Sequence, residues 1–132
     1  MIWPLIKGLA LTLRYTFSKA VTVQYPEERP EISDRFRGRH LLLQDDRGRI
    51  KCVACMLCAT VCPAQCIQIE PGEDEEGKYP QTYRIDLGRC IFCGLCIEAC
   101  PKEAIRMTKA YELAEYRQED LLLDKAKLLR EP

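Results

Sequence analysis

Nine cysteines constrain this chain more than any other feature, because all of them lie between residues 52 and 100. Within that window the chain repeats one pattern, C-x2-C-x2-C-x3-C-P, with 38 positions between the two copies. Self-similarity at a fixed period indicates two copies of one structural unit. We therefore expect two halves packed with approximate two-fold symmetry. The patterned cysteines are Cys52, Cys55, Cys58 and Cys62, then Cys90, Cys93, Cys96 and Cys100.

This spacing is typical of the cysteine runs that hold [4Fe-4S] clusters. Two intervening residues let three thiolates converge on neighbouring corners of one cluster. The fourth cysteine is carried away from them and, in two-cluster ferredoxins, ligates the other cluster. Such swapped ligation would bring the clusters close, as electron transfer between them requires. We assign Cys52, Cys55, Cys58 and Cys100 to one [4Fe-4S] cluster, and Cys90, Cys93, Cys96 and Cys62 to the other.

Structural zinc and disulfides are the alternative uses of these cysteines. Structural zinc commonly joins two separated CxxC units, which three cysteines at two-residue gaps fit poorly. Disulfides are disfavoured by the odd number of cysteines and by the expected compartment. The N-terminus is a poor secretory signal, so we expect a reducing environment in which disulfides are rare. The sequence thus predicts an electron carrier, whereas zinc would leave the protein colourless.

Two further residues near the runs have less obvious roles. Cys66, the ninth cysteine, aligns with Ala104 of the second copy, so we expect a small packed residue; a spare cluster ligand is the alternative. His40 is the only histidine, and we expect it to be structural or solvent-facing. Because no histidine pair and no nucleotide-binding glycine loop accompany the runs, we predict that the chain passes electrons and has no catalytic residues.

Hydrophobic spacing and turn residues predict the surrounding elements. We expect an amphipathic helix over residues 4–18, because Leu5, Leu9 and Leu13 recur at helical spacing. Its basic side, with Lys7 and Arg14, suits a membrane surface or a neighbouring membrane protein. We also expect extended chain over 20–38, a hairpin around a turn at 45–48, short helices near 58–62 and 96–100, strands over 67–70, 83–87 and 105–108, and a loose charged helix or arm over 111–129.

The predicted fold class is α+β, a ferredoxin-like two-cluster core of pseudo-two-fold symmetry with an N-terminal amphipathic helix and extended arms. We divide the chain into an N-terminal helix and docking arm (1–50), a two-cluster domain (51–109) and a charged C-terminal tail (110–132). The acidic stretch 70–76 is expected to be a solvated loop. Net charge is zero, which argues against nucleic acid as a partner, and no segment has the roughly 20 apolar residues that cross a bilayer.

Segments outside the cysteine runs make a more specific likeness. Residues 13–19 and 21–26 resemble the N-terminal helix, and the exit from it, of subunit I of NADH:quinone oxidoreductase, respiratory complex I (the NuoI family). Residues 35–40 resemble its arginine-rich turn before the first cysteine run. Residues 83–86 and 89–96 resemble its second cluster strand and loop. The likeness covers roughly residues 5–110.

This resemblance implies a non-catalytic electron-transfer subunit of a NADH:quinone oxidoreductase, a translocase. It would lie peripherally on the cytoplasmic side of the inner membrane and pass electrons towards a terminal cluster and, indirectly, quinone. The implied partners are neighbouring cluster-bearing subunits and a membrane subunit contacted by the N-terminal helix. The alternatives are a ferredoxin-like subunit of a related membrane-bound hydrogenase or ferredoxin-driven dehydrogenase, or a free ferredoxin.

Overall fold

The computed structural model describes residues 2–131, and the chain divides into two compact units, residues 1–31 and 32–132. The first unit contains helix α1 (Trp3–Thr16), in which Pro4 occupies the first turn, where its missing N–H costs nothing. The hydroxyl of Ser18 donates to the carbonyl of Tyr15 at the other end. The helix predicted over 4–18 is confirmed, and none of its residues is buried. No helix within residues 2–131 is long and apolar enough to cross a membrane.

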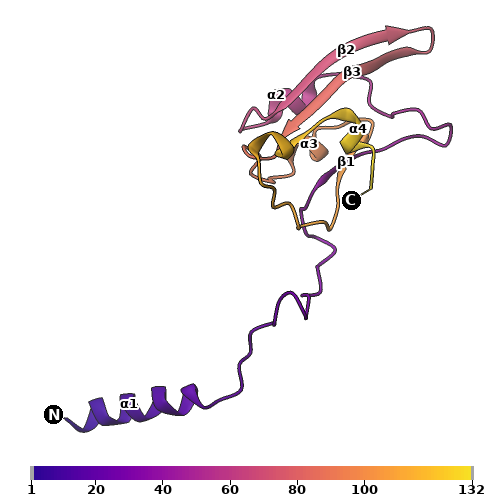
Figure 1. Cartoon of the computed structure of the whole chain (residues 1–132). Coiled ribbons are helices and arrows are strands. Elements are labelled where there is room, and N and C mark those ends of the chain that lie inside the picture. The colour runs from indigo at the N-terminus through magenta and orange to yellow at the C-terminus, as the bar shows by residue number, and fades with distance from the viewer. Residues whose placement is uncertain (1, 132) are drawn as a thin grey trace. The chain divides into compact units, whose positions relative to one another are not determined.

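The second unit contains two antiparallel sheets (Figure 1). One pairs β1 (His40–Leu42) with β4 (Ile105–Met107). The other places β3 (Gly77–Asp86) between β2 (Ile67–Asp74) and β5 (Leu122–Leu123). In the first half of β2, buried isoleucines alternate with exposed polar residues, as a strand with one face on the core requires. Each cysteine run therefore lies between strands of different sheets.

A short helix follows the first two cysteines of each run and contains the third, close to the predicted positions. Helix α2 (Leu57–Val61) begins after Met56 and helix α3 (Leu95–Glu98) begins after Gly94. Both preceding residues are left-handed, with φ of 66° and 84°. A positive φ also occurs at Ala54 and at Phe92, with values of 51° and 52°. The backbone thus repeats its local conformation at the 38-residue offset of the cysteines.

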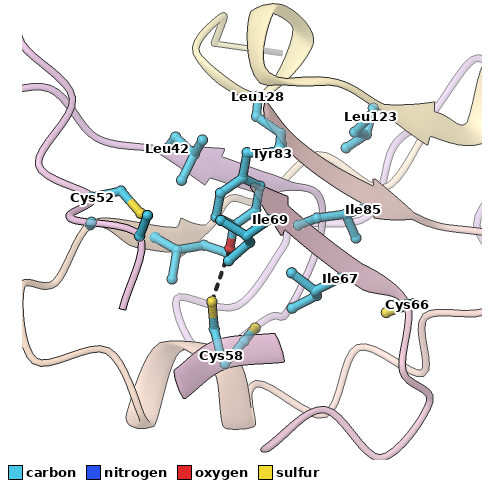
Figure 2. Close-up of a cluster of buried hydrophobic side chains, with 14 of the residues drawn as sticks. Leu42, Cys52, Cys58, Cys66, Ile67, Ile69, Tyr83, Ile85, Leu123 and Leu128 are labelled. Atoms are coloured by element: carbon cyan, nitrogen blue, oxygen red, sulfur yellow. Dashed lines mark hydrogen bonds between the residues drawn. The ribbon is translucent and has the colours of Figure 1, made fainter. Parts of the chain in front are cut away.

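The core of the second unit forms where strands from both sheets meet the C-terminal segment. Ile85 and Leu128 have no exposed surface, and Tyr83 retains only 1%. Leu128 belongs to α4 (Lys125–Leu128), whose N-terminus is capped by the Asp124 carboxylate accepting from the backbone N–H of Lys127. Figure 2 shows this cluster with Cys58 at one end and Leu128 at the other. Sulfur-bearing and aliphatic side chains thus share one core.

The C-terminal segment differs from the prediction of a loose helix or arm over 111–129. It forms a 3₁₀ turn, η1 (Gln118–Leu121), followed by β5 and α4. The ammonium of Lys125 donates to the Gln81 carbonyl at 2.9 Å, and Arg39 donates to the Lys127 carbonyl at 2.7 Å. The segments 32–50 and 110–132 belong to the same compact unit as the cysteine runs. The functional division at residues 50 and 109 stays a prediction.

Two predictions for the polar loops were wrong in part. Most of the acidic stretch 70–76 is not a loop, because β2 continues to Asp74, whose carboxylate pairs with Arg49 at 2.8 Å. The turn at 45–48 exists, with the Gly48 N–H donating to the Asp45 carbonyl. Its flanks meet in one antiparallel bridge, Gln44 with Ile50, and in two hydrogen bonds, from the Asp45 N–H to the Arg49 carbonyl and from the Lys51 N–H to the Leu43 carbonyl. Strand β1 itself pairs with β4, so the hairpin is shorter than predicted and covers only residues 43–51.

Candidate functional site

The eight patterned cysteines line two cavities in the second unit. Each cavity combines three cysteines of one run with the fourth cysteine of the other run. Among residues 2–131, no three His, Cys, Asp or Glu side chains lie together in the way that holds a single metal ion. The first cavity contains Cys52, Cys55, Cys58 and Cys100, and the second contains Cys62, Cys90, Cys93 and Cys96, together with Cys66.

Backbone N–H groups point at the sulfurs in both cavities. The Phe92 N–H donates to Sγ of Cys90 at 3.4 Å, and the Ala104 N–H donates to Sγ of Cys100 at 3.3 Å. Corresponding donors in the other run are the backbone of Ala54 towards Cys52 and of Cys66 towards Cys62. Such donors stabilise a thiolate rather than a thiol. The conformation of these loops therefore stabilises thiolate sulfurs.

Burial opposes ionisation of several of these thiols. It raises the pKa of Cys52, Cys58 and Cys90, and it raises that of Cys96 to about 12. For Cys62, burial acts in the same direction, but hydrogen bonds from the backbone and thiol of Cys66 lower its pKa overall. Buried thiolates need a compensating positive charge, which metal ions supply when they displace the protons. Four convergent thiols in each cavity fit a [4Fe-4S] cluster.

The first cavity has a tyrosine at its inner wall. The hydroxyl of Tyr83 lies 3.3 Å from Sγ of Cys58, within hydrogen-bond distance (Figure 2). Burial raises the pKa of this phenol, so the hydroxyl keeps its proton and can donate it to a ligated sulfur. The remaining wall is mainly apolar, including Leu42, Ile69 and Ile105. Sequence reasoning did not single out Tyr83.

The second cavity has a histidine at its wall. His40 is 1% exposed, and its Nδ1 atom is buried without a hydrogen-bond partner. Its ring lies 5.8 Å from that of Phe92, centroid to centroid, and burial lowers its pKa to about 4. The imidazole is therefore not solvent-facing, which was one of the two expectations from the sequence. No sequence signal marks this position, because His40 reaches the cavity only through the pairing of β1 with β4.

Arg37 adds a positive charge beside the second run. Its guanidinium donates to the Cys93 carbonyl and lies 3.9 Å from the Glu98 carboxylate. A Cβ atom added to Gly94 would lie 3.1 Å from the same guanidinium. Gly94 thus lets an arginine approach the loop closely.

Cys66 is buried, as predicted for a packed residue, but it also lies in the second cavity. Its Sγ atom is 3.5 Å from Sγ of Cys62. Burial and this neighbouring thiol raise the pKa of Cys66. The Cys66 thiol therefore stays neutral and can donate a hydrogen bond to Cys62, which is a predicted cluster ligand. Five cysteines therefore line the second cavity, whereas four line the first.

Comparison with known proteins agrees with this arrangement. A family model described as a 4Fe-4S dicluster domain matches residues 51–104. The NADH-quinone oxidoreductase subunit I 2 of Geobacter metallireducens is 54% identical over 98% of both chains. The corresponding subunit I 1 of Geobacter sulfurreducens is 55% identical, again over 98% of both.

A solved structure is also similar, with a TM-score of 0.59 and 34% identity. It is a chain of the membrane-bound sulfane sulfur reductase, an archaeal respiratory membrane complex. The match covers 84% of this chain and 56% of that one, so this chain spans about half of its length. The near full-length relatives are decisive: the chain belongs to the family of NADH-quinone oxidoreductase subunit I.

Proposed function

We propose that this chain is the electron-relay subunit of a membrane-bound NADH-quinone oxidoreductase, passing single electrons through two [4Fe-4S] clusters. The observation that carries the proposal is the pair of cavities, each with four convergent thiols. The clusters supply the one-electron chemistry when bound. The chain itself holds them, surrounds them with mainly apolar walls and directs N–H groups at their sulfur ligands. It contributes no catalytic residue, and electrons leave towards a terminal cluster and quinone elsewhere in the enzyme.

The ligand assignment follows the swapped arrangement. The lining of each cavity supports it, because the fourth cysteine of each run lies with the first three of the other. Ligation across the two runs ties both halves of the domain together. The first cluster takes Cys52, Cys55, Cys58 and Cys100, and the second takes Cys90, Cys93, Cys96 and Cys62.

The core has approximate two-fold symmetry in this proposal. Ten residues lining the first cavity have a counterpart 38 positions away that lines the second. The strand pairing is also reciprocal: the strand after the first run pairs with the strand before the second, and the strand after the second pairs with the strand before the first. A ferredoxin-like pseudo-dimer within one chain accounts for both observations.

Helix α1 docks on a membrane subunit or the membrane surface in this proposal. Large apolar residues along one side are exposed, among them Leu5, Leu9 and Phe17. Exposed apolar surface of this kind marks an interaction site, and Lys7 and Arg14 suit anionic headgroups beside it. The subunit would therefore sit peripherally on the cytoplasmic side of the membrane, next to other cluster-bearing subunits.

The first experiment counts iron and sulfide in anaerobically purified protein and records its EPR spectrum after reduction. The proposal predicts about eight irons and two interacting S = 1/2 signals. Zinc without iron would contradict it.

A pair of single variants then tests the ligand assignment. Cys62→Ala should damage the cluster held mainly by the second run, and Cys100→Ala should damage the one held mainly by the first. Each effect is read from the EPR signal and iron content of the variant. If Cys62→Ala removed only the first-run cluster, the swapped assignment would be wrong.

A further inference from the structure

His40 and Tyr83 occupy corresponding positions in the two halves of the cysteine domain. In the β1–β4 pair, His40 lies opposite Met107. In the β2–β3 pair, Tyr83 lies opposite Ile69. Met107 follows Ile69 by 38 positions, the offset of the cysteine repeat. The two residues are therefore counterparts, one at the wall of each cavity.

Both counterparts are polar groups in an otherwise largely apolar wall, and both are 1% exposed. The hydroxyl of Tyr83 lies 3.3 Å from Sγ of Cys58. His40 has no such partner, because its Nδ1 atom is buried and unpaired. A buried polar atom without a partner costs about 1–3 kcal/mol. A group that fills the second cavity and accepts a hydrogen bond would remove that cost.

We propose that His40 tunes the second cluster, presenting a neutral N–H donor to its sulfurs as the Tyr83 hydroxyl does to the first. This inference rests on the proposed function, because it requires a cluster in the second cavity. A donor to cluster sulfur stabilises the more negative, reduced state and so raises the reduction potential. A different donor in each half gives one folded unit two clusters of unequal potential. His40 is thus a positioning residue for electron flow rather than a cluster ligand.

The chain contains only one histidine, which allows an unambiguous spectroscopic test. The full chain is produced with ¹⁵N-histidine, loaded anaerobically with iron and sulfide, and reduced. Pulsed EPR should then detect ¹⁵N coupling to the reduced second cluster and none to the first. Eight irons per chain with no ¹⁵N coupling at either cluster would overturn the role of His40. Absence of iron would instead contradict the proposed function itself.

Redox titration of variants provides the second measurement. His40→Phe removes the donor and should lower the reduction potential of the second cluster. At a fixed applied potential, the ratio of reduced to oxidised second cluster should fall about tenfold, which is equivalent to ~59 mV. His40→Gln keeps a neutral N–H donor and should restore most of the shift. Tyr83→Phe is the matched control, which should lower only the first potential. Equal potentials in His40→Phe and the unmodified chain, with eight irons in both, would refute the tuning role.

Discussion

At the scale of single residues, the two cavities differ in the number of cysteines that line them. Cys66 lies 3.5 Å from Cys62, sulfur to sulfur, at the wall of the second cavity. Its counterpart in the first cavity is Ala104, which has no ligating atom in its side chain. A thiol at that distance needs only a small movement to take the place of the neighbouring one. The packed residue expected from the sequence therefore also fits the alternative role of a spare ligand.

This asymmetry predicts different outcomes for equivalent cysteine losses. In Cys62→Ala, we expect Cys66 to occupy the vacant coordination position, so that a second cluster forms with a lower yield and an altered EPR signal. The double variant Cys62→Ala/Cys66→Ala should lose that cluster and about four irons. Cys100→Ala is the control, because no cysteine lies where Ala104 does. Equal iron content in the single and double variants would refute ligand replacement.

At the scale of elements, the two cysteine helices begin from left-handed residues of different kinds. Gly94 precedes α3 with φ of 84°, and a Cβ atom there would lie 3.1 Å from the Arg37 guanidinium. Gly94→Ala should lower the free energy of unfolding by about 1–2 kcal/mol, because a Cβ atom is strained in this conformation. Thermal or denaturant unfolding of the iron-loaded protein measures the change.

The matching position before α2 provides the control. Met56 already holds φ of 66° with a side chain, so Met56→Ala adds no backbone strain. It removes a partly exposed side chain and should cost only about 0.5 kcal/mol. If both alanine variants lost the same free energy, backbone conformation would not be the cause.

The short strand β5 gives a second prediction at this scale. Leu123 is 6% exposed, whereas the adjacent Leu122 is 43% exposed. Leu123→Ala should lower the free energy of unfolding by about 2–5 kcal/mol, since it leaves a cavity in the core. Leu122→Ala in the same strand should cost about 0.5 kcal/mol. Comparable losses in the two variants would show that β5 does not close the core.

Sequence patterns identified the elements whose signal is local. Helix α1 has hydrophobic residues at helical spacing, and α2 and α3 each lie within a run of closely spaced cysteines. Strand β5 and helix α4 were missed because two and four residues are too few for a period to be visible. Their order comes from contacts with distant segments, such as Lys125 bonding to the Gln81 carbonyl. The same cause explains why β1 pairs with β4 rather than across the nearby turn.

The same distinction between local sequence patterns and long-range contacts applies to the candidate site. The eight patterned cysteines were found because metal ligation fixes their spacing along the chain. His40 was not found as a cavity residue, because it reaches its cavity through the pairing of β1 with the distant strand β4. Tyr83 was not found either, because it lies on the β2–β3 hairpin and meets Cys58 only once that hairpin packs against the first run. A sequence alone carries no mark of that register. Ligands are therefore predictable here, whereas the groups that modulate them require the fold.

At the scale of the whole molecule, the clusters are part of the core. Cys52, Cys58 and Cys96 lie within the buried hydrophobic cluster rather than on the surface. Removing iron would leave buried thiols facing a gap, and metal binding energy contributes to folding in such sites. We expect chelation to abolish near-UV circular dichroism and cooperative thermal unfolding, and reloading to restore both. Unchanged unfolding after complete iron loss would show that the polypeptide folds independently of its cofactor.

In contrast, residues 2–31 of the N-terminal unit contribute none of the buried core residues. All of α1 is exposed, and an exposed apolar helix of this length gains little stability by itself in water. Its apolar side is therefore better explained by assembly than by folding. A change on that side should leave both clusters intact and impair attachment.

Two leucines on opposite sides of α1 allow a matched test of this idea. Leu9 lies with Leu5 and Leu13 along the apolar side, whereas Leu11, two residues further, faces away from it. Leu9→Glu should reduce the share of the subunit that fractionates with membranes and with the other subunits, because a carboxylate is costly to bury in a contact. Leu11→Glu introduces the same charge and should have a much smaller effect. Iron content should stay at the unmodified level in both variants. Equal membrane fractions for the two would mean that α1 does not dock through its apolar side.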